Sequence, residues 1–422
     1  MSIPGPSAGK PAHDEVPGLT GLRFVAAFSV LIAHSFAVLM RSHLAAMPQL
    51  TWFMQAAGFG MTLFFVLSGF VIHYNYARVV TTGKGGIAAF LWARFARLYP
   101  LLLLVLAIST LLSIRATVSL QQGRVLDRDG FYGILQALPA FVLSIQSWFY
   151  LPVGDNSLIY AIRGGSAPLT WSISTEWFFY LLYPCVAWAI LRARTPSAAG
   201  ALIALWCALW IAVSTSLFHY SPHMDAWAEH YYGPIAGVKE HFQDSFVRWL
   251  LYFSPYSRLG EFILGALVAQ LYVGLQPRKV TPRENQVGTL LFYCAAASVV
   301  LVTFVEYSPD VEMNIFRKMS LNFALAPSAA LLIFCAARYL NSGSRLLNSR
   351  PAMLLGNASY SIYLVHFGLL MFVAGRIGTH GIVLDLLTVV VVGAMILLIS
   401  ILTYRYYEDP ARKFLRRLVR PS

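Results

Sequence analysis

Long apolar runs, separated by short polar segments, recur along almost the whole chain. A run of about 20 apolar residues is the length of a helix that crosses the hydrocarbon core of a bilayer. The pattern therefore predicts an all-α polytopic membrane protein without a second, soluble domain. We expect one membrane domain over residues 18–407, between a polar tail at 1–17 and a basic tail at 408–422. The runs lie near residues 19–39, 54–77, 89–114, 131–151, 169–191, 198–218, 250–272, 287–306, 320–339, 354–376 and 382–404.

The composition agrees with a membrane protein. Of the 422 residues, 58% are hydrophobic and 12% are charged, and this charged fraction is about half that of soluble domains. The net charge of +13 does not indicate nucleic-acid binding, because Lys and Arg in a membrane protein mainly set topology and contact anionic lipid. The four cysteines lie inside apolar runs without metal-ligand spacing, so we expect packing roles and no metal site.

The distribution of basic residues decides the orientation of the spans. If the run at 131–151 does not cross, most of the 31 Lys and Arg residues fall in cytoplasmic segments, whereas fewer than half do if it crosses. Because basic residues concentrate in cytoplasmic loops, we expect ten spans with both termini in the cytoplasm. The run at 131–151 is then interfacial or re-entrant. Two long outer segments, 115–168 and 219–249, are either solvated connections or part of an acceptor-binding surface.

The first span carries two ionisable residues, Arg23 and His34. A helix advances by roughly 16 Å over this separation and returns nearly to the same direction, so both side chains share one face. Ionisable groups are costly in a membrane and usually serve a function. A neutral imidazole can abstract a hydroxyl proton near pH 7, although His34 could also be a buried histidine bonded to a backbone carbonyl. Arg23 could equally anchor the helix at the cytoplasmic surface.

Two more arginines open the third span, in the motif ARFARLYP. Arg94 and Arg97 are one turn apart, and a guanidinium group binds phosphate through two parallel hydrogen bonds. Ordinary anchoring at the cytoplasmic surface would also explain this pair. Together with Arg23, however, three arginines would line the inner membrane face, which suits a ligand with several phosphates.

Small and acidic residues interrupt two further apolar runs. The motif FFVLSGFVIHY contains Ser68 and Gly69, which allow close approach of another helix or of a slim acyl chain. The motif WSISTEWFFY places Glu176 inside an apolar run, where a carboxylate needs a partner or a proton. The predicted depth of Glu176 is close to that of His34. We therefore expect Glu176 to orient the imidazole, unless it is a structural partner for another helix.

Two later motifs contain polar pairs at helical spacing. In RLGEFILGA, Arg258 and Glu261 can pair on one helix face, as a structural ion pair or as part of an acceptor cavity. In GNASYSIYLVH, Tyr363 and His366 lie in the outer half of a late span. They either line the same cavity as His34 or take part in helix packing.

The order of these motifs resembles the acyltransferase-3 family of membrane acyltransferases, which includes bacterial O-acetyltransferases of O-antigen, exopolysaccharide and nodulation factors. The resemblance covers roughly residues 15–415. It implies a ten-span fold in the bacterial inner (cytoplasmic) membrane. It also implies transfer of an acyl group, usually acetyl, from cytoplasmic acetyl-CoA to a hydroxyl of a glycan or lipid-linked sugar. The motifs that carry it are Arg-x10-His, FFVLSGF, ARFARLYP, WSISTEWFFY, RLGEFILG, SYSIYLVH and YYEDPARK.

The resemblance extends to individual residues. Those that match motifs of the family are Arg23, His34, Arg94, Arg97 and Glu176. We expect His34 and Glu176 to be catalytic, and the three arginines with Ser68 to bind acyl-CoA. Direct transfer to the acceptor and a two-step route through an acyl-enzyme intermediate are both compatible with these residues.

Two other functions fit parts of the pattern. A transporter or flippase of lipid-linked sugars would explain the spans and their charges, but it would be expected to carry inverted repeats, which we do not detect in this sequence. An acyltransferase that modifies a small secondary metabolite would use the same donor site. Some family members carry an extracytoplasmic esterase-like domain. The sequence given ends at Ser422 without one, so we expect the membrane domain and its loops to select the acceptor.

Overall fold

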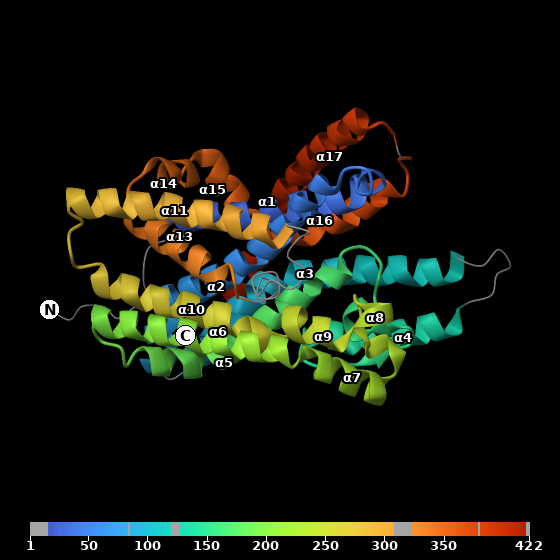
Figure 1. Cartoon of the computed structure of the whole chain (residues 1–422), viewed down its shortest axis with the longest axis horizontal. Helices are drawn as coiled ribbons and strands as arrows, with labels where there is room; N and C mark the ends of the chain where they lie inside the picture. The colour runs from blue at the N-terminus through green and yellow to red at the C-terminus, as the bar shows by residue number, and fades with distance from the viewer. Residues whose placement is uncertain (1–15, 83–84, 120–126, 308–322, 379, 419–422) are drawn as a thin grey trace.

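The computed structural model describes residues 16–82, 85–119, 127–307, 323–378 and 380–418, and this part of the chain is predominantly helical. Figure 1 shows helices that run mostly along the long axis of the molecule, with α17 leaving at a steeper angle. The described strands, β1 (Pro152–Val153) and β2 (Asn156–Ser157), form one short antiparallel hairpin. The α-helices are α1 (Pro17–Leu39), α2 (Thr51–Thr82), α3 (Gly86–Ser119), α4 (Arg128–Val142), α5 (Trp171–Ile190), α6 (Pro196–His219), α7 (Ser221–Tyr232), α8 (Val238–His241), α9 (Phe246–Arg248), α10 (Pro255–Leu275), α11 (Pro282–Tyr307), α13 (Ala326–Arg338), α14 (Ser342–Leu347), α15 (Arg350–Asn357), α16 (Ser359–Ala374), α17 (Ile382–Thr403) and α18 (Asp409–Leu418).

The all-α membrane fold predicted from the apolar runs is confirmed. Seven helices of the described chain are long and apolar enough to cross a membrane, and an eighth span results if α15 and α16 are counted as one, with a bend of 67° between them. The number of ten spans and the cytoplasmic termini stay predictions. In the run at 131–151 the helix α4 has 15 residues, which is too short to cross the hydrocarbon core. This agrees with our expectation that the run does not cross.

The two long segments predicted to lie on the outer side pack against each other. Figure 1 shows α4, α7, α8 and α9 gathered at one end of the molecule. Asp244 joins the segments, because its Oδ1 accepts hydrogen bonds from the backbone N–H and the hydroxyl of Ser157 at 2.6 and 2.8 Å. Tyr150 donates to the backbone carbonyl of the same aspartate at 3.0 Å. The described parts of these segments therefore pack together rather than forming two independent solvated connections.

Helix α2 is central to the bundle and packs closely against α1 and α10. At the crossing of α2 and α10 the two backbones are in direct contact through glycines. A Cβ atom added to Gly69 would lie 1.9 Å from the carbonyl oxygen of Phe262, and one added to Gly265 would lie 1.9 Å from that of Val66. Small residues permit such close helix approach within membranes. Gly69 of the FFVLSGF motif therefore serves helix packing.

Replacing Gly69 with alanine is expected to destabilise the protein. The added methyl group must push α2 away from α10, and such overpacking lowers the free energy of unfolding by about 1–3 kcal/mol. Thermal unfolding of the detergent-solubilised protein measures the effect. Gly58 is a matched control on the same helix, because an added Cβ there has no neighbour within 4 Å among the described residues. Equal midpoints for Gly69→Ala and Gly58→Ala would contradict the close crossing.

Candidate active site

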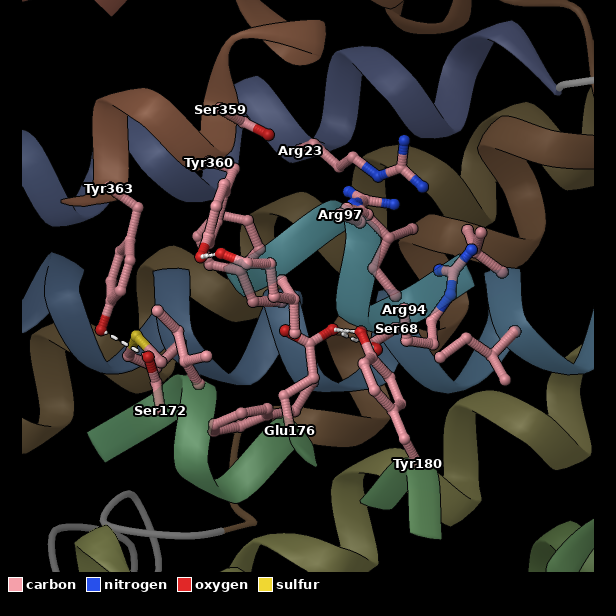
Figure 2. A pocket seen from close by; sticks show the side chains of 18 residues that line it. Arg23, Ser68, Arg94, Arg97, Ser172, Glu176, Tyr180, Ser359, Tyr360 and Tyr363 are labelled. Carbon is pink, nitrogen blue, oxygen red and sulfur yellow. Dashed lines mark hydrogen bonds between the residues drawn. The ribbon is translucent and has the colours of Figure 1, made fainter. Parts of the chain in front are cut away.

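A pocket inside the bundle brings together side chains from five helices, α1, α2, α3, α5 and α16. The space within it, including its opening, is about 730 Å³. Apolar and aromatic side chains form most of its wall. Figure 2 shows that the arginines gather at one end of the pocket, that Tyr363 and Ser172 lie at the other, and that Glu176 lies between them. The polar residues of the lining are Arg23, Ser68, Arg94, Arg97, Ser172, Glu176, Tyr180, Ser359, Tyr360 and Tyr363.

The cationic end of the pocket is formed by the three arginines that the sequence placed at one membrane face. Arg94 is only 5% exposed, and its Nη2 donates to the Tyr76 hydroxyl at 2.9 Å. Arg94 Nε is buried without a hydrogen-bond partner in the described part of the chain. Arg97 is half-buried and makes no ion pair or hydrogen bond with a described residue. No described carboxylate is in direct contact with Arg94 or Arg97. Their positive charge is therefore available for a bound anion.

The carboxylate of Glu176 lies in the pocket among hydroxyl groups. Its Oε1 accepts hydrogen bonds from Ser68 Oγ at 2.8 Å and from the Tyr180 hydroxyl. It also interacts electrostatically with Arg94. The predicted contact between Glu176 and His34 is wrong, because the carboxylate is bonded to Ser68 and Tyr180, whereas His34 is bonded to His366. Glu176 instead fixes Ser68 and Tyr180 along the pocket wall.

For the acetyl transfer from acetyl-CoA that the family resemblance implies, these partners of Glu176 predict a small effect of Glu176→Gln on turnover. Glutamine keeps an oxygen that accepts from Ser68 and Tyr180, so we expect kcat within about fivefold of wild type. Glu176→Ala loses both hydrogen bonds, and we expect the KM for acetyl-CoA to rise about tenfold. Steady-state kinetics on both variants measures these changes. A loss of kcat by about 10³-fold in both variants would restore the orienting role of Glu176.

Tyr363 of α16 lines the far end of the pocket. Its hydroxyl accepts a hydrogen bond from Ser172 Oγ at 2.7 Å and donates to the backbone carbonyl of Leu169 at 2.9 Å (Figure 2 shows the first). The ring of Phe64 packs edge-on against the Tyr363 ring, with centroids 5.9 Å apart. On the same helix, the His366 ring lies 6.0 Å from the Tyr363 ring. Tyr363 therefore lies between the pocket and the next polar group, a histidine pair.

His34 and His366 form this pair beyond Tyr363. His34 Nδ1 and His366 Nε2 are 2.8 Å apart, and the two rings lie edge to edge, with centroids 5.1 Å apart and planes tilted by 15°. The other ring nitrogen of His366, Nδ1, lies 3.0 Å from the backbone carbonyl of Ile362. His366 is fully buried and His34 is half-buried. Neither lines the pocket, so the shared helix face runs from Arg23 inside the pocket to His34 just past its far end.

Arg258 and Glu261 do not belong to this site. Arg258 Nη1 and Glu261 Oε1 are 2.9 Å apart, and both side chains are fully buried. Thr62 of α2 donates to the same Oε1 at 2.7 Å, which ties α10 to α2. Neither residue lines the pocket. The prediction of an acceptor cavity here is therefore not supported, and the structural ion pair is what the structure shows.

A structural role for this ion pair predicts strong non-additivity. Arg258→Met leaves a buried carboxylate without its cation, which lowers the free energy of unfolding by about 3–5 kcal/mol. The double variant Arg258→Met/Glu261→Met removes both charges and is expected to recover most of that loss. Thermal unfolding of the purified variants checks both expectations. A single variant as stable as wild type would contradict the structural role.

Several residues near the site were missed by the sequence analysis. Tyr180 lies one helical turn after Glu176, and this spacing could have indicated the pair. Tyr76 and Tyr360 gave no comparable signal. Arg416 belongs to the predicted basic tail at 408–422, and in the structure α18 packs on α3, where Trp92 Nε1 donates to the carbonyl of Leu415 at 3.0 Å. Arg416 interacts electrostatically with Arg94 and Arg97, so it adds positive charge beside the cationic end.

Comparison with known proteins identifies the family of this chain. Residues 16–405 match the family described as the acyltransferase domain, the acyltransferase-3 family. The chain belongs to this family. Family membership confirms the resemblance seen in the motifs and establishes the chain as a membrane-embedded acyltransferase domain.

Two curated relatives illustrate the range of this family. O-acetyltransferase OatA of Staphylococcus aureus is 23% identical over 411 residues, which are 94% of this chain and 57% of OatA. Acyltransferase MdmB of Streptomyces mycarofaciens is 28% identical over 355 residues, which are 83% of this chain and 78% of MdmB. The chain thus spans little more than half the length of OatA. No solved structure matches the chain.

Proposed function

We propose that this acyltransferase takes an acyl group, acetyl in the simplest case, from cytoplasmic acyl-CoA and transfers it to a hydroxyl group of an acceptor. The observation that carries the proposal is one pocket with three arginines at one end and a far end beside a histidine pair. A CoA thioester has the same polarity, because its phosphates and its acyl group lie at opposite ends of an extended molecule.

The donor would enter at the cationic end. Arg23, Arg94 and Arg97 would bind the phosphates, since guanidinium groups match phosphate oxygens through paired hydrogen bonds. The pantetheine arm would run past Ser68 and Glu176 toward Tyr363. The rise of α1 between Arg23 and His34 is roughly 16 Å, a length that an extended arm can span. The cytoplasmic side of the arginines follows from the predicted topology.

His34 would act as the general base at the far end. It would remove the proton of the acceptor hydroxyl while the hydroxyl oxygen attacks the thioester carbonyl. The carbon–sulfur bond then breaks, the new ester forms, and the CoA thiolate leaves and takes up the proton. With an acyl-enzyme intermediate, the same overall transfer would take place in two steps. In either route the phosphates stay at the arginines while the reaction takes place beside His34.

The acceptor is proposed to be a hydroxyl of an extracytoplasmic or lipid-linked glycan, reached from the outer side of a bacterial inner (cytoplasmic) membrane. The relative OatA, named as an O-acetyltransferase, supports transfer of acetyl to an oxygen atom, and the glycan is what the family resemblance implies. The relative MdmB, named only as an acyltransferase, keeps open an acceptor that is a small secondary metabolite.

Binding of CoA by the purified protein tests the donor half of the proposal. Isothermal titration with CoA is expected to show one site, and adenosine 3′,5′-bisphosphate is expected to compete whereas adenosine is not. This outcome would place the recognition energy in the phosphates. Absence of CoA binding, or equal competition by adenosine, would contradict donor binding at the arginines.

A further inference from the structure

We propose that His366 is a positioning residue that fixes the protonation state of His34 and makes its Nε2 the basic nitrogen. This inference rests on the proposed role of His34 as general base. It goes beyond that role because it assigns a function to a buried residue that does not line the donor pocket. The hydrogen bonds between His34, His366 and the α16 backbone carry the argument.

The direction of these hydrogen bonds follows from the chemistry of their ends. A backbone carbonyl can only accept, so the 3.0 Å contact with Ile362 requires that His366 Nδ1 carries a proton. In a neutral imidazole the other nitrogen is then an acceptor. His366 Nε2 therefore accepts from His34 Nδ1–H across 2.8 Å. His34 is left with an unprotonated Nε2, the form that a general base needs.

His366 is also the partner that can stabilise the charge formed in the reaction. When His34 Nε2 takes a proton, the ring becomes an imidazolium, and its Nδ1–H bond to His366 becomes charge-assisted and stronger. The proton on Nδ1 can also pass to His366 Nε2, which leaves His366 donating through both nitrogens. The other described ring that packs against His34 is Phe367, at 5.3 Å, which offers no hydrogen-bond acceptor.

A purely structural histidine would not require this arrangement. His366 is fully buried, and a buried polar ring is costly unless both nitrogens are bonded. An apolar residue of similar size would fill the space and leave Ile362 in its helix. The polar ring at this position is explained by what it does for His34, in the way that a histidine base is held by a hydrogen-bond acceptor in other acyl-transfer sites.

Two substitutions of His366 differ in whether the new side chain can accept a hydrogen bond from His34. His366→Gln places an amide oxygen close to the position of Nε2, so it can still accept from His34. His366→Asn has a shorter side chain that reaches the Ile362 carbonyl but not His34. We expect kcat for acetyl transfer to fall by about 10²–10⁴-fold in His366→Asn, and to recover to within about tenfold of wild type in His366→Gln. The KM for acetyl-CoA is expected to stay within about twofold in both, because the donor pocket is unchanged.

The outcomes separate this inference from the proposed function. Equal kcat values for the two folded variants would overturn the positioning role, even if His34→Ala is inactive. Full activity of a folded His34→Ala protein would remove the base itself and the proposed function with it. His366→Leu adds a third comparison, since it matches the volume without an acceptor and should behave like His366→Asn. If His366→Leu does not fold, the comparison of His366→Gln with His366→Asn still tests the positioning role.

Discussion

His34→Ala is expected to lower kcat for acyl transfer by about 10³–10⁴-fold, because the reaction loses its general base. Binding of CoA should be unchanged, since His34 does not line the donor pocket. Turnover with acetyl-CoA, measured beside CoA binding on the same preparation, separates these two effects. The expected combination is intact binding with almost no turnover.

The matched control for this prediction is another buried histidine. His73 of α2 is bonded to Gln270 at 3.0 Å and does not line the pocket. His73→Gln keeps hydrogen-bonding capacity and is expected to retain most of the activity. A folded His34→Ala protein that transfers acetyl at the wild-type rate would remove His34 from the reaction.

Arg97→Gln is expected to raise the KM for acetyl-CoA by about 10–100-fold, with a smaller change in kcat. The estimate corresponds to the loss of a charge-assisted hydrogen bond worth about 1.5–3 kcal/mol. Arg97 suits this test because it has no ion pair or hydrogen bond with a described residue, so its removal leaves the fold largely undisturbed. Steady-state kinetics with acetyl-CoA gives the result.

Two controls show whether the phosphates are responsible. Acetyl-pantetheine lacks the nucleotide phosphates, so its KM should be the same for wild type and Arg97→Gln. Arg192 is an exposed arginine that stacks on Trp188 outside the pocket, and Arg192→Gln should leave the KM for acetyl-CoA unchanged. An equal rise in KM for both thioesters would argue against phosphate binding by Arg97.

That the three arginines lie at one face of the membrane domain could be predicted, because this depends only on their positions within the spans and on the orientation of the spans. Arg23 and Arg97 belong to different helices, but the positive-inside pattern places both at one face. Lateral neighbours were harder to predict. Predicted depth put Glu176 beside His34, whereas in the structure Glu176 lies between the arginines and Tyr363, bonded to Ser68, and His34 lies beyond Tyr363. The sequence of one helix does not give its position relative to another helix.

The contact between His34 and His366 likewise could not be predicted from the sequence. The SYSIYLVH motif indicated that His366 could be near His34, but only packing of α16 on α1 brings the two rings to a 2.8 Å contact. Gly69 was ambiguous between acyl-chain access and helix packing, and the α10 backbone decides for packing. Sequence patterns thus predicted which residues are polar, buried and on one helix face. Contacts between helices required the three-dimensional arrangement.

Release of free thiol from acetyl-CoA by the purified protein tests the central claim most directly. Wild-type protein is incubated with acetyl-CoA and a cell-envelope glycan extract as a source of acceptor hydroxyls, beside His34→Ala. We predict thiol release by wild type, with a matching amount of ester-linked acetyl in the glycan fraction, and neither product with His34→Ala. Movement of lipid-linked sugar across vesicles by wild type, without thiol release in the presence or absence of extract, would contradict the acyltransferase and support a transporter.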